Sequence, residues 1–310
     1  MSGRSSAAFA VALLVVVTGS AAARGGEVLR VCLNAELPPW SVHDGAKSGG
    51  FDVAVADAVA RRVGQKLALE WFETKLEQDS STTSAANALL SDRRCRLVGG
   101  YPLVESALGK PGMRSARLPD FEGAKPTDRG RAVELGTLVP SRAYHFAALT
   151  VVLGPGAALA RVTDLANLES IKLGVEGGTL ADAALMLFGD GRFVDQITHV
   201  VPGRGELLLR LEKGEYGATL VELRRFDAYR AKHPGTNLTP SGYYSLIGFN
   251  MGFVGLSTDE DLMKQIDRAI ADMLENKEFP ALARAAGVTY LPPRQPNVSR
   301  DVTITDLRRN

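Results

Sequence analysis

Residues 50–60, Gly-Phe-Asp-Val-Ala-Val-Ala-Asp-Ala-Val-Ala, decide the fold of this chain. Apolar side chains recur four residues apart along the stretch, which predicts a helix with one buried face, and Asp52 stands where a capping side chain is expected. Short apolar segments at 28–33 and 66–72 flank the helix. The order strand, helix, strand predicts the start of a parallel sheet, with the turn before the helix forming one wall of a cleft.

The rest of the chain continues the alternation of strands and helices. Further strands are expected at 95–100, 146–153, 171–175, 197–201, 218–221 and 249–256. Further helices are expected at 85–90, 180–188, 206–211, 223–232, 259–276 and 281–286. The pattern therefore predicts an α/β chain with two lobes, each a mixed sheet flanked by helices. Two apolar strands join the lobes, so that the lobes close on a ligand like a hinged clamp.

We divide the chain at these two connections. Residues 27–146 together with 257–291 form lobe one, and residues 154–245 form lobe two. The hinge strands are expected at 147–153 and 246–256. The remaining residues, 292–310, contain three prolines and are predicted to form a peripheral C-terminal extension.

The N-terminal segment 1–23 has the pattern of a signal peptide. Arg4 precedes an apolar run at 7–17, and three small residues follow at 21–23. The run is shorter than the roughly 18 apolar residues of a membrane helix. We therefore expect a protein that is exported to the periplasm. Without this segment the formal net charge falls from +1 to zero, which argues against a nucleic acid partner.

One internal segment, 109–136, differs in composition from the rest. Overall, 45% of the residues are hydrophobic and 23% are charged, which is ordinary for a globular protein with room for two cores. Segment 109–136 instead combines prolines, glycines and scattered charges with little periodicity. A loop of this length is unusual in a compact domain. It forms either a flap over the cleft or a surface insertion.

Residue types that carry catalysis or bind metals lack the spacing that these functions require. The four histidines are far apart in the sequence: His43, His145, His199 and His233. We therefore expect no enzyme activity, no metal and no cofactor. In an oxidising compartment, Cys32 and Cys95 either form a disulfide or stay as two buried thiols. Cys32 ends one predicted strand and Cys95 begins another, an arrangement that does not favour the bridge.

Several short motifs occur in a fixed order between about residues 28 and 291. They are Leu29-Arg-Val-Cys32, Pro39-Trp40, Gly50-Phe-Asp-Val53, Asp164-Leu165, Leu173-Gly-Val-Glu-Gly-Gly-Thr179 and the closing helix. Their order resembles the family 3 extracellular solute-binding proteins, the periplasmic receptors of polar amino acid ABC transporters. The resemblance implies the type II periplasmic binding protein fold and capture of a small polar organic solute for an ABC permease by hinge closure. We also expect a monomer.

The sequence departs from this family where the ligand is clamped. The family's arginine, which holds the α-carboxylate, would follow the strand at 95–100, but residues 100–107 read Gly-Tyr-Pro-Leu-Val-Glu-Ser-Ala. An amino acid bound in the family's usual way is therefore not expected. Cys32, Cys95 and the Gly-Tyr-Pro motif resemble a branch associated with quinoprotein methanol and alcohol dehydrogenases. That resemblance implies an alternative function, a periplasmic accessory that docks on the dehydrogenase or its cytochrome.

Seven residues are candidates for ligand binding: Asn34, Trp40, Gly100, Tyr101, Gly178, Thr179 and Glu222. Gly178 and Thr179 open a helix whose free amides favour an anion, although Thr179 and Asp182 also fit a capping box. Trp40 and Tyr101 either pack on a ligand or fill the core. Glu222 is either a partner for a cation or an exposed acid at a helix start.

Overall fold

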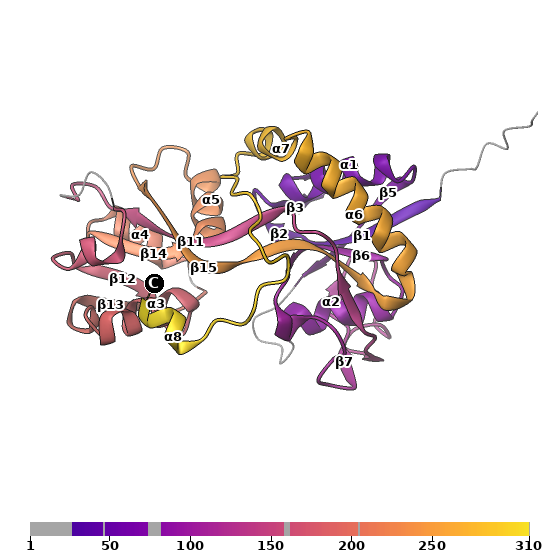
Figure 1. The fold of residues 1–310 in the computed structure, drawn as a ribbon, viewed down its shortest axis with the longest axis horizontal. Helices are drawn as coiled ribbons and strands as arrows, with labels where there is room; N and C mark the ends of the chain where they lie inside the picture. The colour runs from indigo at the N-terminus through magenta and orange to yellow at the C-terminus, as the bar shows by residue number, and fades with distance from the viewer. Residues whose placement is uncertain (1–26, 46, 74–81, 158–161, 204, 310) are drawn as a thin grey trace, which may run out of the picture.

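The computed structural model describes residues 27–45, 47–73, 82–157, 162–203 and 205–309. Two lobes lie side by side, and two long strands join them (Figure 1). The predicted signal peptide, 1–23, lies outside the described residues. In the part of the chain that the structure describes, no helix is both long enough and apolar enough to cross a membrane.

Lobe one is a sheet between two layers of helices (Figure 1). Its strands are β1 (Val28–Asn34), β5 (Lys66–Glu73), β6 (Leu97–Pro102), β8 (Asp120–Phe121) and β10 (Leu138–Pro140). Its helices are α1 (Phe51–Arg62), α2 (Thr82–Ser91), α6 (Glu260–Glu275) and α7 (Phe279–Ala286). A small sheet of β2 (Glu36–Leu37), β3 (Ser41–Asp44) and β4 (Lys47–Gly49) precedes α1. The apolar faces of α1, α6 and α7 pack on one side of the main sheet, and α2 packs on the other.

Lobe two repeats this arrangement. Its parallel strands are β12 (Leu173–Glu176), β13 (Ile197–Val200) and β14 (Ala218–Glu222). Its helices are α3 (Leu180–Leu187), α4 (Glu206–Glu212) and α5 (Leu223–Lys232). α3 packs on one face of the sheet, whereas α4 and α5 pack on the other. The helices and strands predicted for this lobe therefore form, and they form a second core.

Two long strands, β11 (His145–Leu153) and β15 (Thr239–Leu256), connect the lobes. They pair antiparallel with each other, and the end of β15 also pairs with β6. Among the described residues, ten strands thus form one continuous hydrogen-bonded sheet, where the sequence predicted one sheet in each lobe. β15 also begins well before the predicted strand at 249–256. Its first half contains proline and glycine, which are rare in strands, so pairing with β11 imposes its extended conformation.

Segment 109–136 is a surface insertion on lobe one. Within it, β7 (Ser115–Arg117) pairs with β9 (Ala132–Glu134), and β8 extends the main sheet beside β5. Leu118 and Val133 are buried in the cluster that includes α2. These apolar side chains attach the segment to lobe one, so it follows the surface-insertion alternative and not the flap.

Cys32 and Cys95 form a disulfide, and their Cα atoms lie 5.7 Å apart. Cys32 lies in β1, and Cys95 lies just before β6, the strand that pairs with β1. The Arg96 N–H donates a hydrogen bond to the Arg30 carbonyl (2.9 Å), which keeps the approach to β6 beside β1. This close approach brings the two cysteines together although the strands run parallel.

The C-terminal extension predicted as peripheral, 292–310, instead crosses the hinge. It runs from α7 to α8 (Ile304–Arg309), which lies on lobe two beside α3 (Figure 1). Leu307 of α8 is buried in the lobe-two core. In the hinge, the buried Asn250 side chain donates from Nδ2 to the carbonyl oxygens of Arg294 and Asn297. The segment is therefore a strap that holds both lobes, and we call it the C-terminal strap.

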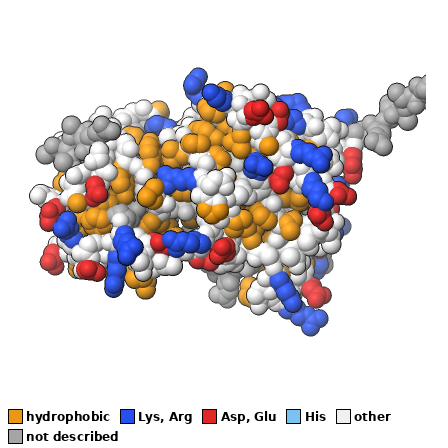
Figure 2. Space-filling model, viewed as in Figure 1, with side chains coloured by type: hydrophobic (Ala, Val, Ile, Leu, Met, Phe, Trp, Pro, Cys, Tyr) orange, Lys and Arg blue, Asp and Glu red, His pale blue; other side chains and the backbone are white. Residues whose placement is uncertain are grey.

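The face of the molecule shown in Figure 2 carries charges of both signs. Basic and acidic side chains alternate over both lobes, and hydrophobic side chains lie between them. This mixed surface agrees with the near-zero net charge of the sequence.

Candidate interlobe site

The carboxyl ends of four strands meet where the two lobes face each other. β1 and β6 end there on lobe one, and β12 and β14 end there on lobe two. Ligands of open α/β sheets bind at the carboxyl ends of strands. Two cavities lie at this edge, one on each lobe.

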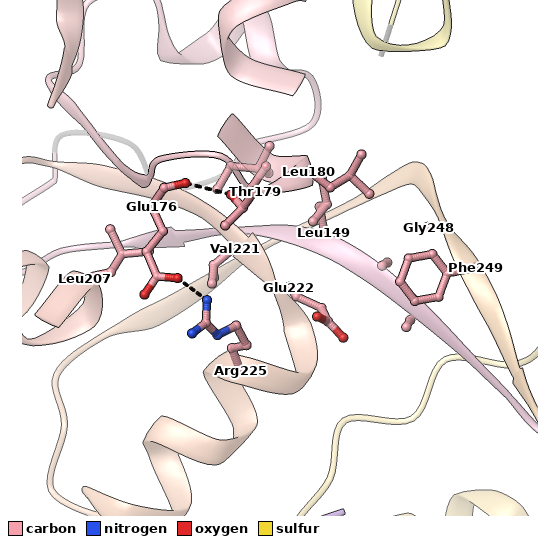
Figure 3. A pocket seen from close by; sticks show the side chains of 14 residues that line it. Leu149, Glu176, Thr179, Leu180, Leu207, Val221, Glu222, Arg225, Gly248 and Phe249 are labelled. Carbon is pink, nitrogen blue, oxygen red and sulfur yellow. Dashed lines mark hydrogen bonds and ion pairs between the residues drawn. The ribbon is translucent and has the colours of Figure 1, made fainter. Parts of the chain in front are cut away.

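The cavity on lobe two has a volume of about 120 Å³. Strands β12 and β14, the starts of α3 and α5, and both hinge strands contribute to it (Figure 3). Inside, Arg225 Nη1 donates to the Glu176 carboxylate, and Thr179 Oγ1 donates to the Glu176 carbonyl (2.8 Å). Glu222 lies beside this pair and is half-buried. The cavity therefore presents both signs of charge against apolar hinge residues.

The cavity on lobe one is smaller, about 40 Å³. Asn34, Gly100 and Tyr101 line it together with Asp52. Arg224, from the start of α5 in lobe two, also lines it. Residues of both lobes therefore meet in this cavity.

Two candidates in this cavity, Tyr101 and Asn34, hydrogen-bond to nearby residues of lobe one. The Tyr101 hydroxyl donates to the Ala107 carbonyl (2.6 Å), and burial raises the pKa of this phenol. Asn34 Oδ1 accepts the Glu36 N–H (2.9 Å). Tyr101 is therefore buried and still lines the cavity, so its contact with a ligand stays a prediction.

Asp52 is the buried carboxylate at this interface. The N-cap of α1 is Gly50, so the prediction that Asp52 caps the helix is wrong. Its carboxylate turns inward instead, where Oδ1 accepts from the Tyr144 hydroxyl (2.8 Å) and Oδ2 lies 3.6 Å from Nη2 of Arg224. The Gly100 N–H donates to the same Tyr144 oxygen (2.8 Å). Burial raises the pKa of Asp52, and the Arg224 charge and the Tyr144 hydrogen bond oppose this rise.

Trp40 packs in the lobe-one core and also faces lobe two. Its ring lies 5.5 Å from the Phe51 ring and 4.6 Å from the His145 ring, measured between centroids. The guanidinium carbon of Arg224 lies 4.7 Å from the centre of the Trp40 ring. Within the described residues, neither the indole nitrogen nor the two ring nitrogens of His145 have a hydrogen-bond partner. Burial and the Arg224 charge lower the pKa of His145 to about 3.

The start of α3 follows the capping alternative. The Asp182 N–H donates to Thr179 Oγ1 (3.2 Å), and the Gly178 N–H donates to the Asp182 carboxylate (2.8 Å). His199 Nε2 lies 2.9 Å from the same carboxylate. The chain's own carboxylate thus engages the Gly178 amide, and contact of this amide with an anionic ligand stays a prediction. Gly178 and Trp40 line neither of the two cavities.

The candidates thus fall into two groups, with Asn34, Gly100 and Tyr101 on lobe one, and Thr179 and Glu222 on lobe two. Sequence reasoning missed the charged residues Glu176, Arg224 and Arg225. A signal for the two arginines was present, since they follow the end of β14 almost directly. Across the described ranges, no three His, Cys, Asp or Glu side chains gather in a way that could hold a metal ion.

No protein-family model matches the sequence, and no curated protein matches it. Solved structures do resemble the chain. The L-cystine solute receptor of Neisseria gonorrhoeae, in its unliganded open conformation, superposes with a TM-score of 0.60 at 17% identity. The match covers 87% of this chain and 97% of that one.

Two further structures have the same architecture. The second substrate binding domain of a putative amino acid ABC transporter from Streptococcus pneumoniae has a TM-score of 0.60 at 13% identity, covering 84% of this chain and 100% of that one. An ancestral cationic amino acid solute binding protein has a TM-score of 0.55 at 16% identity, covering 83% and 94%. At these identities the likeness concerns the fold. The predicted fold class, a two-lobed periplasmic binding protein fold, is confirmed.

Proposed function

We propose that this chain is a periplasmic solute-binding protein that captures a small polar organic solute between its lobes for an ABC importer. The observation that carries the proposal is the lobe-two cavity, which has both signs of charge and lies at the carboxyl ends of β12 and β14. Both hinge strands line this cavity, so closure of the lobes encloses a bound solute. The role needs no chemical step and no cofactor.

Charged side chains of the cavity suit a solute that carries both charges. Arg225 presents a planar guanidinium, the group that best holds a carboxylate, and the buried Glu176 carboxylate orients it. Glu222 offers a carboxylate to an ammonium group. Arg225 thus supplies from lobe two the guanidinium that the loop at 100–107 lacks.

The cavity is small for a solute of amino acid size. Its volume of about 120 Å³ is below the roughly 300–1,000 Å³ of usual ligand pockets. In the proposed cycle the lobes part to admit a solute of amino acid size and then close on it. Hinge closure of this kind is expected for two lobes joined by two strands.

The proposed partner of the solute-loaded protein is an ABC importer. One of the similar structures belongs to a putative amino acid ABC transporter, which motivates this choice. Genes for a permease and an ATPase next to the gene for this chain would support it. Genes for a quinoprotein dehydrogenase and a cytochrome c would favour the accessory role instead, which stays a prediction.

A thermal-shift screen with amino acids, small organic acids and amines tests the binding role. A solute that binds the native state at about 100 times its Kd raises the free energy of unfolding by about 2.7 kcal/mol. Glu222→Gln should weaken the response to a solute with an ammonium group. Glu169→Gln, an exposed acid elsewhere on lobe two, should not. If no compound raises the melting temperature of the wild type, the proposal fails.

A further inference from the structure

Arg224 belongs to lobe two, but its side chain lies against lobe one. Its Nη2 lies 3.6 Å from Oδ2 of Asp52, and its guanidinium carbon lies 4.7 Å from the centre of the Trp40 ring. Only 13% of the Arg224 side chain and 3% of the Asp52 side chain are exposed. A carboxylate and an aromatic face both attract a cation, and burial strengthens both interactions.

The next residue of α5 behaves differently. Arg225 pairs with Glu176 inside lobe two, and 45% of its side chain remains exposed. Two consecutive arginines on one helix thus have partners in different lobes. The position of the Arg224 side chain therefore depends on its lobe-one partners, Asp52 and Trp40, and not only on its place in α5.

Other residues of lobe one hold Asp52 and Trp40, the two partners of Arg224, in place. The Tyr144 hydroxyl donates to Asp52 Oδ1, and the Gly100 N–H donates to Tyr144. Gly100 has φ +62°, and a Cβ there would lie 2.8 Å from Asp52 Oδ2, so glycine leaves room for the carboxylate. Phe51 packs edge-on against Trp40. A site that is already arranged binds its ligand at a lower entropic cost.

Two later residues of α5 also hydrogen-bond to lobe one. The Asp227 carboxylate accepts from the Thr289 N–H and from the Thr289 hydroxyl, both at 2.8 Å. Arg230 Nη2 donates to the Gly287 carbonyl (3.3 Å). Gly287 and Thr289 follow α7 of lobe one. Three residues spaced three apart, Arg224, Asp227 and Arg230, thus connect α5 to lobe one, and Arg224 is the one that lines the lobe-one cavity.

We propose that Asp52, Trp40 and Tyr144 form a cation site of lobe one, which Arg224 fills as a built-in ligand that latches the lobes together. The site accepts guanidinium-type cations, and a free guanidinium compound competes with the Arg224 side chain for it. This inference does not depend on the proposed transport role, which uses the cavity of lobe two.

Chemical rescue of Arg224→Ala tests the site. The probe is ethylguanidinium chloride, which carries the atoms that the substitution removes. Calorimetry should show saturable binding to the variant, at least about tenfold tighter than binding of the uncharged analogue ethylurea. The wild type should show no comparable binding, because Arg224 occupies the site. A folded variant that binds neither compound, or binds both equally, overturns the proposal.

Two control variants sharpen this experiment. Arg210→Ala removes a guanidinium that pairs with Glu215 within lobe two, and it should not create an ethylguanidinium site. Asp52→Asn combined with Arg224→Ala should lose the rescue, and retained binding in this double variant would contradict the assigned carboxylate. Arg224→Met keeps the apolar stem of the side chain and replaces the alanine variant if that variant does not fold.

Small-angle X-ray scattering tests the latch separately. The radius of gyration of Arg224→Ala should exceed that of the wild type, because the contact between the lobes is lost. Bound ethylguanidinium should not reverse this change, since it has no covalent link to lobe two. Equal radii for the wild type and the variant would show that Arg224 does not hold the lobes together.

Discussion

His145 should make the stability of this protein depend steeply on pH below neutrality. Its side chain is 1% exposed and lies among the rings of Trp40, Phe51 and Tyr290. Neither ring nitrogen has a hydrogen-bond partner among the described residues. Burial and the nearby Arg224 charge lower the pKa of His145 from 6.5 to about 3. We therefore choose His145→Leu, which removes the titrating group and suits the apolar surroundings.

The sign and the size of the effect follow from proton binding. Between pH 3 and pH 6.5 the unfolded chain binds a proton at this histidine and the folded protein does not, so stability rises with pH. The contribution of the neutral ring is complete above pH 6.5 and is lost as the pH falls. One proton corresponds to about 1.4 kcal/mol per pH unit, so lowering the pH to about 5 costs about 2 kcal/mol.

Urea unfolding at about pH 7 and about pH 5 measures this loss. The free energy of unfolding of the wild type should fall by about 2 kcal/mol more than that of His145→Leu over this range. Acidic groups that titrate in the same range are present in both proteins, so the difference isolates His145. Equal pH dependence in the two proteins would refute the reasoning, because it would mean that the folded protein accommodates the charged ring.

Two further substitutions test the interlobe contacts by urea unfolding. Gly100→Ala should cost about 1–3 kcal/mol, because a residue with φ +62° would gain a Cβ that meets a carboxylate. Gly64→Ala, with φ +71° and open space around it, is the matched control and should cost less. Leu307→Ala should cost about 2–3 kcal/mol and speed hydrogen exchange in the C-terminal strap, since this side chain attaches α8 to the lobe-two core. Ile304→Ala, on the exposed side of α8, should change little, and equal losses in the two variants would argue against the strap.

Local apolar spacing was enough to predict most helices and strands. The stretch at 50–60 became α1, and Phe51, Val55 and Val59 of the predicted ridge are buried together with the alanines beside them. The first half of β15 could not be found in this way. Its tyrosines favour a strand, but Pro240 and Gly242 interrupt the pattern, and pairing with β11 keeps the segment extended. Long-range pairing of this kind leaves no local pattern.

The C-terminal strap escaped prediction for a related reason. Its helix α8 is only six residues long, and its prolines read as a loose tail. What holds the strap is the buried Asn250 side chain, which hydrogen-bonds to its backbone from the hinge. A buried polar residue in an apolar strand is a signal that something must satisfy its amide. The sequence does not say which segment does so.

For the candidate site, the topology was more informative than the residue types. The family resemblance indicated Asn34 and Glu222. The rule that ligands lie at strand carboxyl ends indicated Tyr101, and the structure places all three at the facing edges of the lobes. It did not indicate Arg224, whose partners come from another lobe and lie far away in the sequence. At the start of α3 the residue types were informative. The capping interaction expected from Thr179 and Asp182 forms, and the Asp182 carboxylate also accepts the Gly178 N–H.

The start of α5 links the two cavities, and this link bears on solute affinity. Arg224 contacts lobe one, whereas Arg225 lines the lobe-two cavity, and the two are consecutive residues of α5. In the proposed cycle the lobes part to admit a solute, and parting breaks the Arg224 contact. The apparent Kd equals the intrinsic Kd divided by the fraction of molecules that are open. A latch that keeps nine molecules in ten closed therefore weakens apparent affinity about tenfold, and loss of Arg224 removes that penalty without touching the cavity itself.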